Sequence, residues 1–172
     1  MPIKSKAVLI LGSRDHDNEI AFVQSLGHAA LLFSAKISLE DALAVDVPVE
    51  INLNEEERVV AKALALGRRF DIVAVYTLVE YRVPLAARVA AALGLHYGLP
   101  WEAALNCRNK TRTRQILAQH QLGSARFVIV RTPQEALAAL AGFSLPVIVK
   151  PSNDAGSNQV MCCTTSQEVE AA

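Results

Sequence analysis

The stretch "LPVIVKPSNDAGSNQV", Leu145–Val160, decides the fold assignment of this chain. An apolar run of strand length ends at Lys150 and Pro151, a loop of small polar residues follows, and a second apolar run begins at Val160. The pattern predicts two paired strands joined by a loop. Such a loop can expose backbone N–H groups to an anion, and Lys150 would supply the matching charge. A plain hairpin with an exposed lysine also fits, and this lysine precedes its loop, unlike the lysine of a Walker motif.

A basic cluster, "NCRNKTRTR", lies about 40 residues before Lys150 and begins a predicted helix. At helical spacing Lys110 and Arg114 share one face, and Arg108 and Arg112 share another. Basic residues near a helix N-terminus oppose the helix macrodipole, which favours an external anion such as phosphate, although a solvated helix start fits as well. Nucleic-acid binding is disfavoured, because the cluster has no interleaved aromatic residues and the chain has 17 basic and 17 acidic residues.

The part of the chain before this cluster alternates strand and helix patterns, which predicts a parallel, doubly wound sheet. Continuous apolar runs suit strands that are buried on both faces. A capping box of Asn54 and Glu57 is expected to open the helix that ends at Gly67. The other predicted elements are strands at Ala7–Gly12, Ala29–Ser34, Pro48–Leu53 and Asp71–Thr77, and helices at Glu19–Gly27 and Pro84–Gly94.

The pattern changes within His96–Asn106, where glycine, proline and tryptophan form a connector with a short helical turn. We therefore expect one domain at 1–105 and another at 106–172. The second domain ends on a helix of little more than one turn and has only three strand patterns, so we expect the front part of a longer protein, with a frayed natural terminus as the alternative. Its predicted elements are helices at Lys110–Gly123, Pro133–Phe143 (capped by Thr132 with Glu135) and from a Ser166 cap, and strands at Ala125–Arg131, Leu145–Lys150 and Asn158–Thr164.

Composition excludes several classes of protein. The 172 residues are 52% hydrophobic and carry no net charge, so no global charge steers the chain to nucleic acid or membrane surfaces. The apolar runs are strand-sized, far below the roughly 18 residues of a membrane span, and we expect a cytoplasmic protein. The three cysteines have no C-x-x-C spacing, and the four histidines are scattered, so reduced cysteines and no metal site are expected.

Two further places are candidates for binding a substrate. The loop after the first strand holds Ser13, Arg14, Asp15 and His16, which would serve a substrate or cap the next helix. It has one glycine and no G-x-G-x-x-G, so a nucleotide-dependent oxidoreductase is disfavoured. Glu80 and Arg82 follow the fourth predicted strand, where a solvated helix start is the alternative. No set of side chains has the spacing of a nucleophilic triad, and no catalytic residue is assigned.

The two stretches together resemble the opening of an ATP-grasp domain. "RNKTRTRQILAQHQLGSARFVIV" and "LPVIVKPSNDAGSNQV" follow that family's order: a lysine at a helix start, a strand, a helix, then a strand with a second lysine and a loop. The preceding "VEYRVPLAARVAAALGLHYGLPWEAALNCRNK" resembles the pre-ATP-grasp domain of carboxylate–amine ligases. Biotin carboxylase and carbamoyl phosphate synthase belong to the wider group of enzymes that it resembles. The resemblance implies an α/β protein, with a Rossmann-like parallel sheet followed by the incomplete first part of an ATP-grasp α+β domain.

The resemblance also implies a reaction and its binding residues. ATP would phosphorylate a small-molecule carboxylate to an acyl phosphate, from which an amine or thiol displaces phosphate. The family's magnesium ligands would lie beyond residue 172, so this chain alone is expected to be inactive, and a non-catalytic nucleotide-binding or regulatory module is the alternative. The sequence allows a homodimer. The residues implied to hold the ATP phosphates are Lys110 and Lys150 with the loop Ser152, Asn153, Asp154, Ala155, Gly156, Ser157 and Asn158. This loop has one glycine, whereas the loops of many relatives have several.

Overall fold

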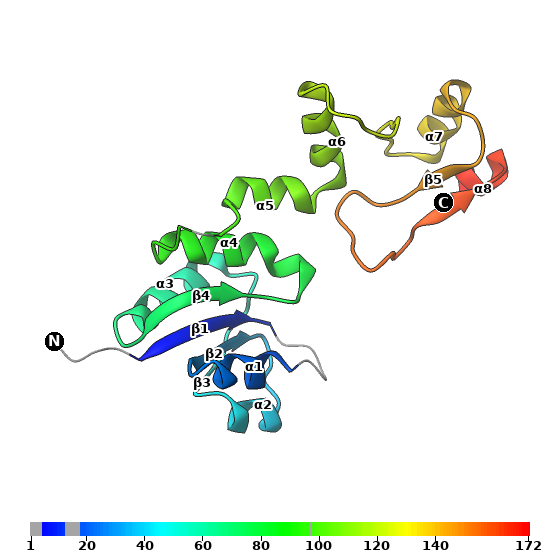
Figure 1. Cartoon of the computed structure of the whole chain (residues 1–172). Helices are drawn as coiled ribbons and strands as arrows, with labels where there is room; N and C mark the ends of the chain where they lie inside the picture. The colour runs from blue at the N-terminus through cyan, green and yellow to red at the C-terminus, as the bar shows by residue number, and fades with distance from the viewer. Residues whose placement is uncertain (1–4, 13–17, 97) are drawn as a thin grey trace. The chain divides into compact units, whose positions relative to one another are not determined.

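The computed structural model describes residues 5–12, 18–96 and 98–172 (Figure 1). The candidate residues Ser13, Arg14, Asp15 and His16 lie outside the described residues. The chain divides into two compact units, Met1–Leu105 and Asn106–Ala172, which are described separately. Among the residues described, no helix is both long and apolar enough to cross a membrane.

The first unit is built on a four-stranded sheet in the order β3-β2-β1-β4, with every pairing parallel. The predicted parallel sheet is therefore confirmed. The apolar residues Ala7–Leu11 of β1 are all buried, because the central strand has helices on both of its faces. Strand β3 ends three residues before the prediction, where the side chain of Asn52 accepts a hydrogen bond from the amide of Asn54 and turns the chain. The strands are β1 (Lys6–Leu11), β2 (Ala29–Ser34), β3 (Val47–Glu50) and β4 (Asp71–Tyr76).

Helices cover both faces of this sheet and divide its core in two (Figure 1). On one face, Leu9 of β1 packs in a cluster with Val59 of α3 (Glu56–Gly67) and Val89 of α4 (Val83–Ala92). On the other face, Ile10 packs in a cluster with Val23 of α1 (Glu19–Ser25). The alternation along β1 follows from the two-residue period of a strand.

Helix α2 (Leu39–Ala44) has no counterpart among the predicted elements. Leu39, Ala42 and Leu43 have helical spacing, but the helix has only six residues, fewer than the window in which such spacing predicts a helix, and it buries none of them. Leu39 and Leu43 are exposed. The helix begins after Ser38, whose hydroxyl accepts a hydrogen bond from the amide of Asp41 at 3.0 Å.

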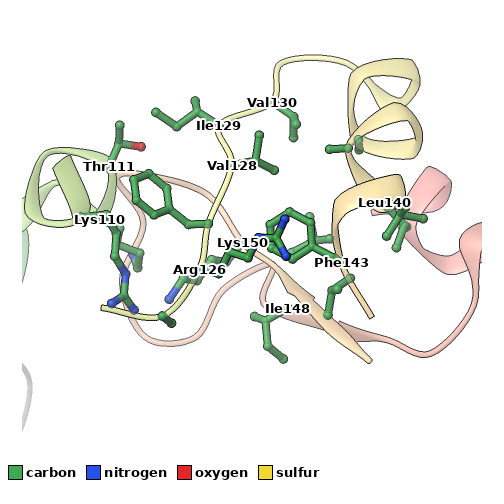
Figure 2. Close-up of a pocket in the computed structure, with 18 of the residues that line it drawn as sticks. Lys110, Thr111, Arg126, Val128, Ile129, Val130, Leu140, Phe143, Ile148 and Lys150 are labelled. Carbon is green, nitrogen blue, oxygen red and sulfur yellow. The ribbon is translucent and has the colours of Figure 1, made fainter. Parts of the chain in front are cut away.

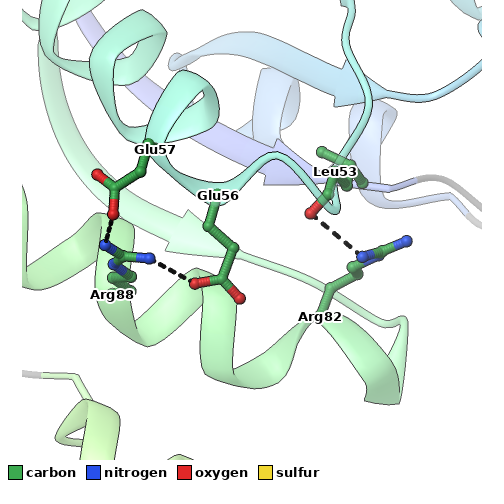
Figure 3. Close-up of polar contacts among 5 residues, drawn as sticks. All are labelled: Leu53, Glu56, Glu57, Arg82 and Arg88. Atoms are coloured by element: carbon green, nitrogen blue, oxygen red, sulfur yellow. Dashed lines mark hydrogen bonds and ion pairs between the residues drawn. The ribbon is translucent and has the colours of Figure 1, made fainter.

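The predicted capping box at α3 is wrong. The helix begins after Glu55, whose side chain makes no capping hydrogen bond. The side-chain oxygen of Asn54 instead accepts from the guanidinium of Arg82 at 2.8 Å. Glu57 forms an ion pair with Arg88, as Figure 3 shows. A guanidinium is a stronger hydrogen-bond donor than a backbone amide, and it draws both side chains away from the helix end.

Arginines tie the helices of the first unit together (Figure 3). Arg88 on α4 contacts Glu56 on α3 at 2.6 Å as well as Glu57. Arg82, in the short 3-10 helix η1 (Glu80–Arg82), also donates to the carbonyl of Leu53 at 3.2 Å. Arg82 therefore links the segments that follow β3 and β4, which is a structural role.

The predicted connector holds a helix of two turns, α5 (Trp101–Arg108), in place of a short helical turn. Within the first unit, the guanidinium of Arg88 lies 5.8 Å from the centre of the Trp101 ring, which is cation–π distance. This contact adds a packing partner for Trp101 that the sequence pattern does not show.

The second unit holds one small antiparallel sheet of β5 and β6, in which Val147 lies opposite Cys163. The predicted pairing across the polar loop is confirmed, although both strands are shorter than predicted. Pro146, joined to Leu145 by a cis peptide bond, precedes β5. The elements are α6 (Lys110–Gln119), α7 (Pro133–Ala139), the 3-10 helix η2 (Leu140–Gly142), β5 (Val147–Val149), β6 (Met161–Cys163) and α8 (Ser166–Ala171).

The predicted strand at Ala125–Arg131 is wrong. Residues 125–130 have no secondary structure, and no described strand pairs with them. The apolar side chains are only partly covered, with Val128 53% exposed. A strand needs a neighbouring backbone for its ladder of hydrogen bonds, and in the described part of this unit no neighbour reaches this segment.

The two predicted helix starts of the second unit differ from the structure in detail. Thr132 caps α7 by accepting from the amide of Glu135 at 3.1 Å, but the Glu135 carboxylate accepts from the amide of Arg131, one residue before the cap. For α8, the cap is Thr165 and the predicted cap Ser166 is wrong. Thr165 has a glutamate three residues later and completes a capping box, whereas Ser166 has Val169 at that spacing.

Candidate functional site

The second unit contains a cavity of about 460 Å³ (Figure 2). It is lined by the start of α6, the extended segment 125–130, the end of α7 with η2, and β5. Its volume lies within the range of small-molecule binding sites. Much of the lining is apolar and includes Val128, Ile129, Val130, Leu140 and Phe143.

Four cationic side chains line the same cavity: Lys110, Arg114, Arg126 and Lys150. No acidic residue is among the described residues that line it. Arg126 lies over the ring of Phe143, at 4.8 Å from its centre, so charge and aromatic surface are joined at one place. The cavity thus suits a molecule that has both an apolar part and several negative charges.

The two lysines predicted from the sequence both face this cavity, although 40 residues separate them (150 − 110). Lys150 directly follows β5 and is exposed. Lys110 is the first residue of α6 and is half-buried. The helix begins there because Asn109 accepts a hydrogen bond from the amide of Arg112 at 3.0 Å, which is the N-cap arrangement.

The predicted phosphate loop lies against the start of α6. The side-chain amine of Lys110 donates to the carbonyl of Asp154 at 2.5 Å, and Arg108 donates to the carbonyl of Asn153 at 2.6 Å. The hydroxyls of Thr111 and Ser152 are 2.9 Å apart. In this conformation the loop turns carbonyl oxygens, rather than amides, toward the cations.

Only part of the predicted loop reaches the cavity. Ser152 lines it beside Pro151 and Lys150. The rest of the loop, all of it described, is not in the lining, and its exposed members are Asn153, Gly156, Ser157 and Asn158, while Asp154 and Ala155 are half-buried. Arg112 from the basic cluster is exposed and also lies outside the lining.

The structure adds two cavity residues that sequence reasoning missed. Arg126 stands at the start of an apolar run that predicts a strand, and Phe143 lies in a segment that predicts the end of a helix. Neither position belongs to a motif, so their convergence depends on the fold of the unit. A basic residue beside an apolar run is too common a pattern to have identified Arg126.

Metal-ligating side chains do not gather in the described part of the chain, where no group of three or more His, Cys, Asp and Glu forms. Cys107, Cys162 and Cys163 are all free thiols. Burial raises the pKa of the Cys163 thiol, with the Glu168 carboxylate adding to the effect, so Cys163 stays protonated.

Comparisons with known proteins agree with the resemblance drawn from the sequence. Residues 107–172 match the RimK-like ATP-grasp domain family. Among solved structures, the L-amino acid ligase of Bacillus licheniformis is 32% identical, with a TM-score of 0.76 over 99% of this chain and 42% of that chain. A second similar structure is the biotin carboxylase domain of the Hydrogenobacter thermophilus 2-oxoglutarate carboxylase, crystallised as a dimer with MgADP and bicarbonate. It is 18% identical, with a TM-score of 0.67 over 98% of this chain and 39% of that chain. At this identity the likeness supports the fold alone. These comparisons therefore bear out the resemblance to the ATP-grasp superfamily, and residues 107–172 carry the match to the family model.

A curated relative also spans most of the chain. The uncharacterized protein y4rH of Sinorhizobium fredii is 23% identical over 171 residues, which cover 96% of this chain and 36% of that protein. The chain thus spans less than half the length of the relatives it matches.

Proposed function

From the premise that this chain carries the sequence pattern and fold of the ATP-grasp superfamily, we propose that it forms the front part of an ATP-dependent carboxylate–amine or carboxylate–thiol ligase. The observation that carries the proposal is the cavity of the second unit, where Lys110 and Lys150 face one apolar space. The substrate classes come from the likeness to an L-amino acid ligase and are part of the proposal.

The residues that line the cavity fit an adenine nucleotide. The apolar surface of Val128, Ile129 and Phe143 suits a flat base, which gains from removal from water. Four cations without a lining carboxylate suit a triphosphate, which carries several negative charges. The cavity volume of about 460 Å³ is that of a small-molecule site.

The described residues do not fit magnesium in the same way, because the cavity lining has no carboxylate. Magnesium takes oxygen ligands and commonly enters such sites with substrate phosphates. We therefore assign no metal ligand to this chain and place magnesium with the bound nucleotide.

Three features of the second unit have a part in the proposed mechanism: the two lysines and the loop. ATP, when bound, would supply the phosphoryl group that converts a carboxylate into an acyl phosphate. Lys150, at the end of β5, and Lys110, at the start of α6, would hold and neutralise the phosphates. The loop Ser152–Asn158 would move over them and exclude water, since a few hydrogen bonds and no strand ladder join it to α6.

The proposal is tested first by nucleotide binding to the chain. Isothermal titration with MgATP should give a measurable Kd, and Lys150→Ala should raise it about tenfold or more, because one charged contact to phosphate is worth roughly 1.5–3 kcal/mol. The matched control is Lys62→Ala, an exposed lysine on α3 in the other unit, which should leave the Kd unchanged. Equal Kd values for all three proteins would refute the phosphate role of Lys150.

A second experiment distinguishes a ligase from a regulatory nucleotide-binding module. In a longer protein that continues this chain with the remainder of an ATP-grasp domain, a carboxylate and an amine should stimulate release of phosphate from ATP, and Lys150→Ala should abolish the release. ATP binding without any stimulated release would favour the regulatory module.

A further inference from the structure

Arg108 contacts the proposed phosphate loop although it does not line the cavity. Its guanidinium donates to the carbonyl of Asn153 at 2.6 Å and makes a longer contact of 3.5 Å to the carbonyl of Asp154. Arg108 is the last residue of α5 and lies two residues before Lys110. A planar guanidinium with several donors suits two neighbouring oxygens better than a lysine does.

Together, Arg108 and Lys110 hold three consecutive carbonyls of the loop. The backbone amide of Lys110 donates to Ser152 at 2.9 Å, Arg108 donates to Asn153, and the Lys110 amine donates to Asp154 at 2.5 Å. The amide of Lys110 belongs to the first turn of α6, where helix amides have no partner within the helix. The loop therefore occupies both the amine and the helix end.

This arrangement conflicts with the proposed binding of phosphate. An anion at Lys110 would use the same amine and the same positive helix end. Carbonyl oxygens carry partial negative charge, so a phosphate would be repelled from them while the loop keeps this position. Nucleotide and docked loop thus exclude one another at Lys110.

We infer that Arg108 is a positioning residue that keeps the loop docked in a self-blocked state, in which the Asp154 carbonyl takes the place of phosphate on Lys110. The hydrogen bond from Arg108 to the Asn153 carbonyl holds the docked loop but has no part in the proposed binding of phosphate. Only the blocking of nucleotide binding rests on the proposed function. The docking of the loop by Arg108 is a property of the chain itself.

The contacts that hold the loop are weak enough to break. Arg108 is half-buried and Asn153 is exposed, so water competes for this hydrogen bond. A partly exposed hydrogen bond of this kind changes an opening equilibrium by roughly three- to tenfold. If the docked loop cannot bind nucleotide, the apparent Kd is the intrinsic Kd divided by the open fraction.

Hydrogen exchange without nucleotide tests the docking. In Arg108→Ala, the amides of residues 153–159 should exchange roughly three- to tenfold faster than in the wild type. Arg112→Ala is the matched control, because it removes a charge from an exposed position of the same segment. Equal exchange in the two variants would overturn the inference. If Arg108→Ala does not fold by circular dichroism, Arg108→Met keeps the aliphatic stem and removes only the donors.

Titration with MgATP tests the blocking, with Arg112→Ala as the reference of equal charge. Arg108→Ala should bind MgATP more tightly than Arg112→Ala, by the same factor as its loop amides exchange faster. Weaker binding would show that Arg108 holds the nucleotide, which overturns the self-blocked state. If no protein binds MgATP, the proposed function fails, and the exchange comparison still decides whether Arg108 docks the loop.

Discussion

Replacing Gly12 by alanine should destabilise the first unit through two separate effects. Gly12 follows β1 with a φ of +74°, a left-handed conformation that costs an alanine about 1–2 kcal/mol. An added Cβ would also lie 3.1 Å from a methyl carbon of Val79. Val79 cannot easily move, because its amide donates to the Thr77 hydroxyl at 3.0 Å, and overpacking of this kind costs about 1–3 kcal/mol. We therefore expect a total loss of about 2–5 kcal/mol in the free energy of unfolding.

The chain offers a matched control for the backbone effect alone. Gly27 has the same φ of +74°, but an added Cβ there would meet no atom within 4 Å. Gly27→Ala should therefore lose only about 1–2 kcal/mol. Urea unfolding can be followed by the fluorescence of Trp101, the single tryptophan, which lies in the same unit. In a double-mutant cycle, Val79→Ala should recover the steric part of the Gly12→Ala loss. Equal losses for Gly12→Ala and Gly27→Ala, with no coupling to Val79, would refute the argument.

Three further predictions concern the end of the chain and its thiols. The Thr164 amide holds the pKa of Glu168 below its ordinary value of 4.5. The ionised carboxylate therefore stabilises the fold above that pH, and its contribution to the free energy of unfolding is lost as the pH falls further. Glu168→Gln should flatten this part of an acid-unfolding curve. Thr165→Ala should cost about 1 kcal/mol in urea unfolding by removing the cap of α8, whereas Ser166→Ala should change stability by a few tenths of a kcal/mol. A chromogenic thiol reagent should label two cysteines quickly in the native chain and the third only in denaturant, because Cys107 and Cys162 are exposed and Cys163 is buried.

The elements that the sequence predicts well are those whose signals are local. The continuous apolar run of β1 and the helix that ends at Gly67 appear at the expected places. The partnership of β5 and β6 also follows from two apolar runs joined by a short polar loop. In each case the residues that determine the element lie within it or directly beside it.

The errors occur where the deciding partner is distant in sequence. Asn54 does not cap α3 because Arg82, 28 residues later, takes its side-chain oxygen. Residues 125–131 have strand-forming side chains, but a strand also requires a neighbouring backbone, which composition does not supply. Helix α2 was missed for another reason, since its six residues are too few for a periodic pattern to stand out.

The candidate site divides in the same way. Lys110 and Lys150 were predicted because one begins a recognisable helix and the other follows a recognisable strand, and the structure places both on one cavity. Arg126 was not found, because its role depends on an extended segment that passes beside η2 and on the ring of Phe143. The docking of the loop on Arg108 likewise requires coordinates, since no motif predicts a contact to a backbone carbonyl.

The unpaired segment at 125–131 has a consequence for solubility. Phe127, Val128, Ile129 and Val130 form an apolar run of high β-propensity, and in the described structure no strand shields their backbone. Arg126 and Arg131 flank the run at its two ends. Charged residues in such flanking positions act as gatekeepers, since stacking identical segments in register would bring like charges together. The same guanidinium that lies over Phe143 in the cavity thus also stands at a gatekeeper position of this run.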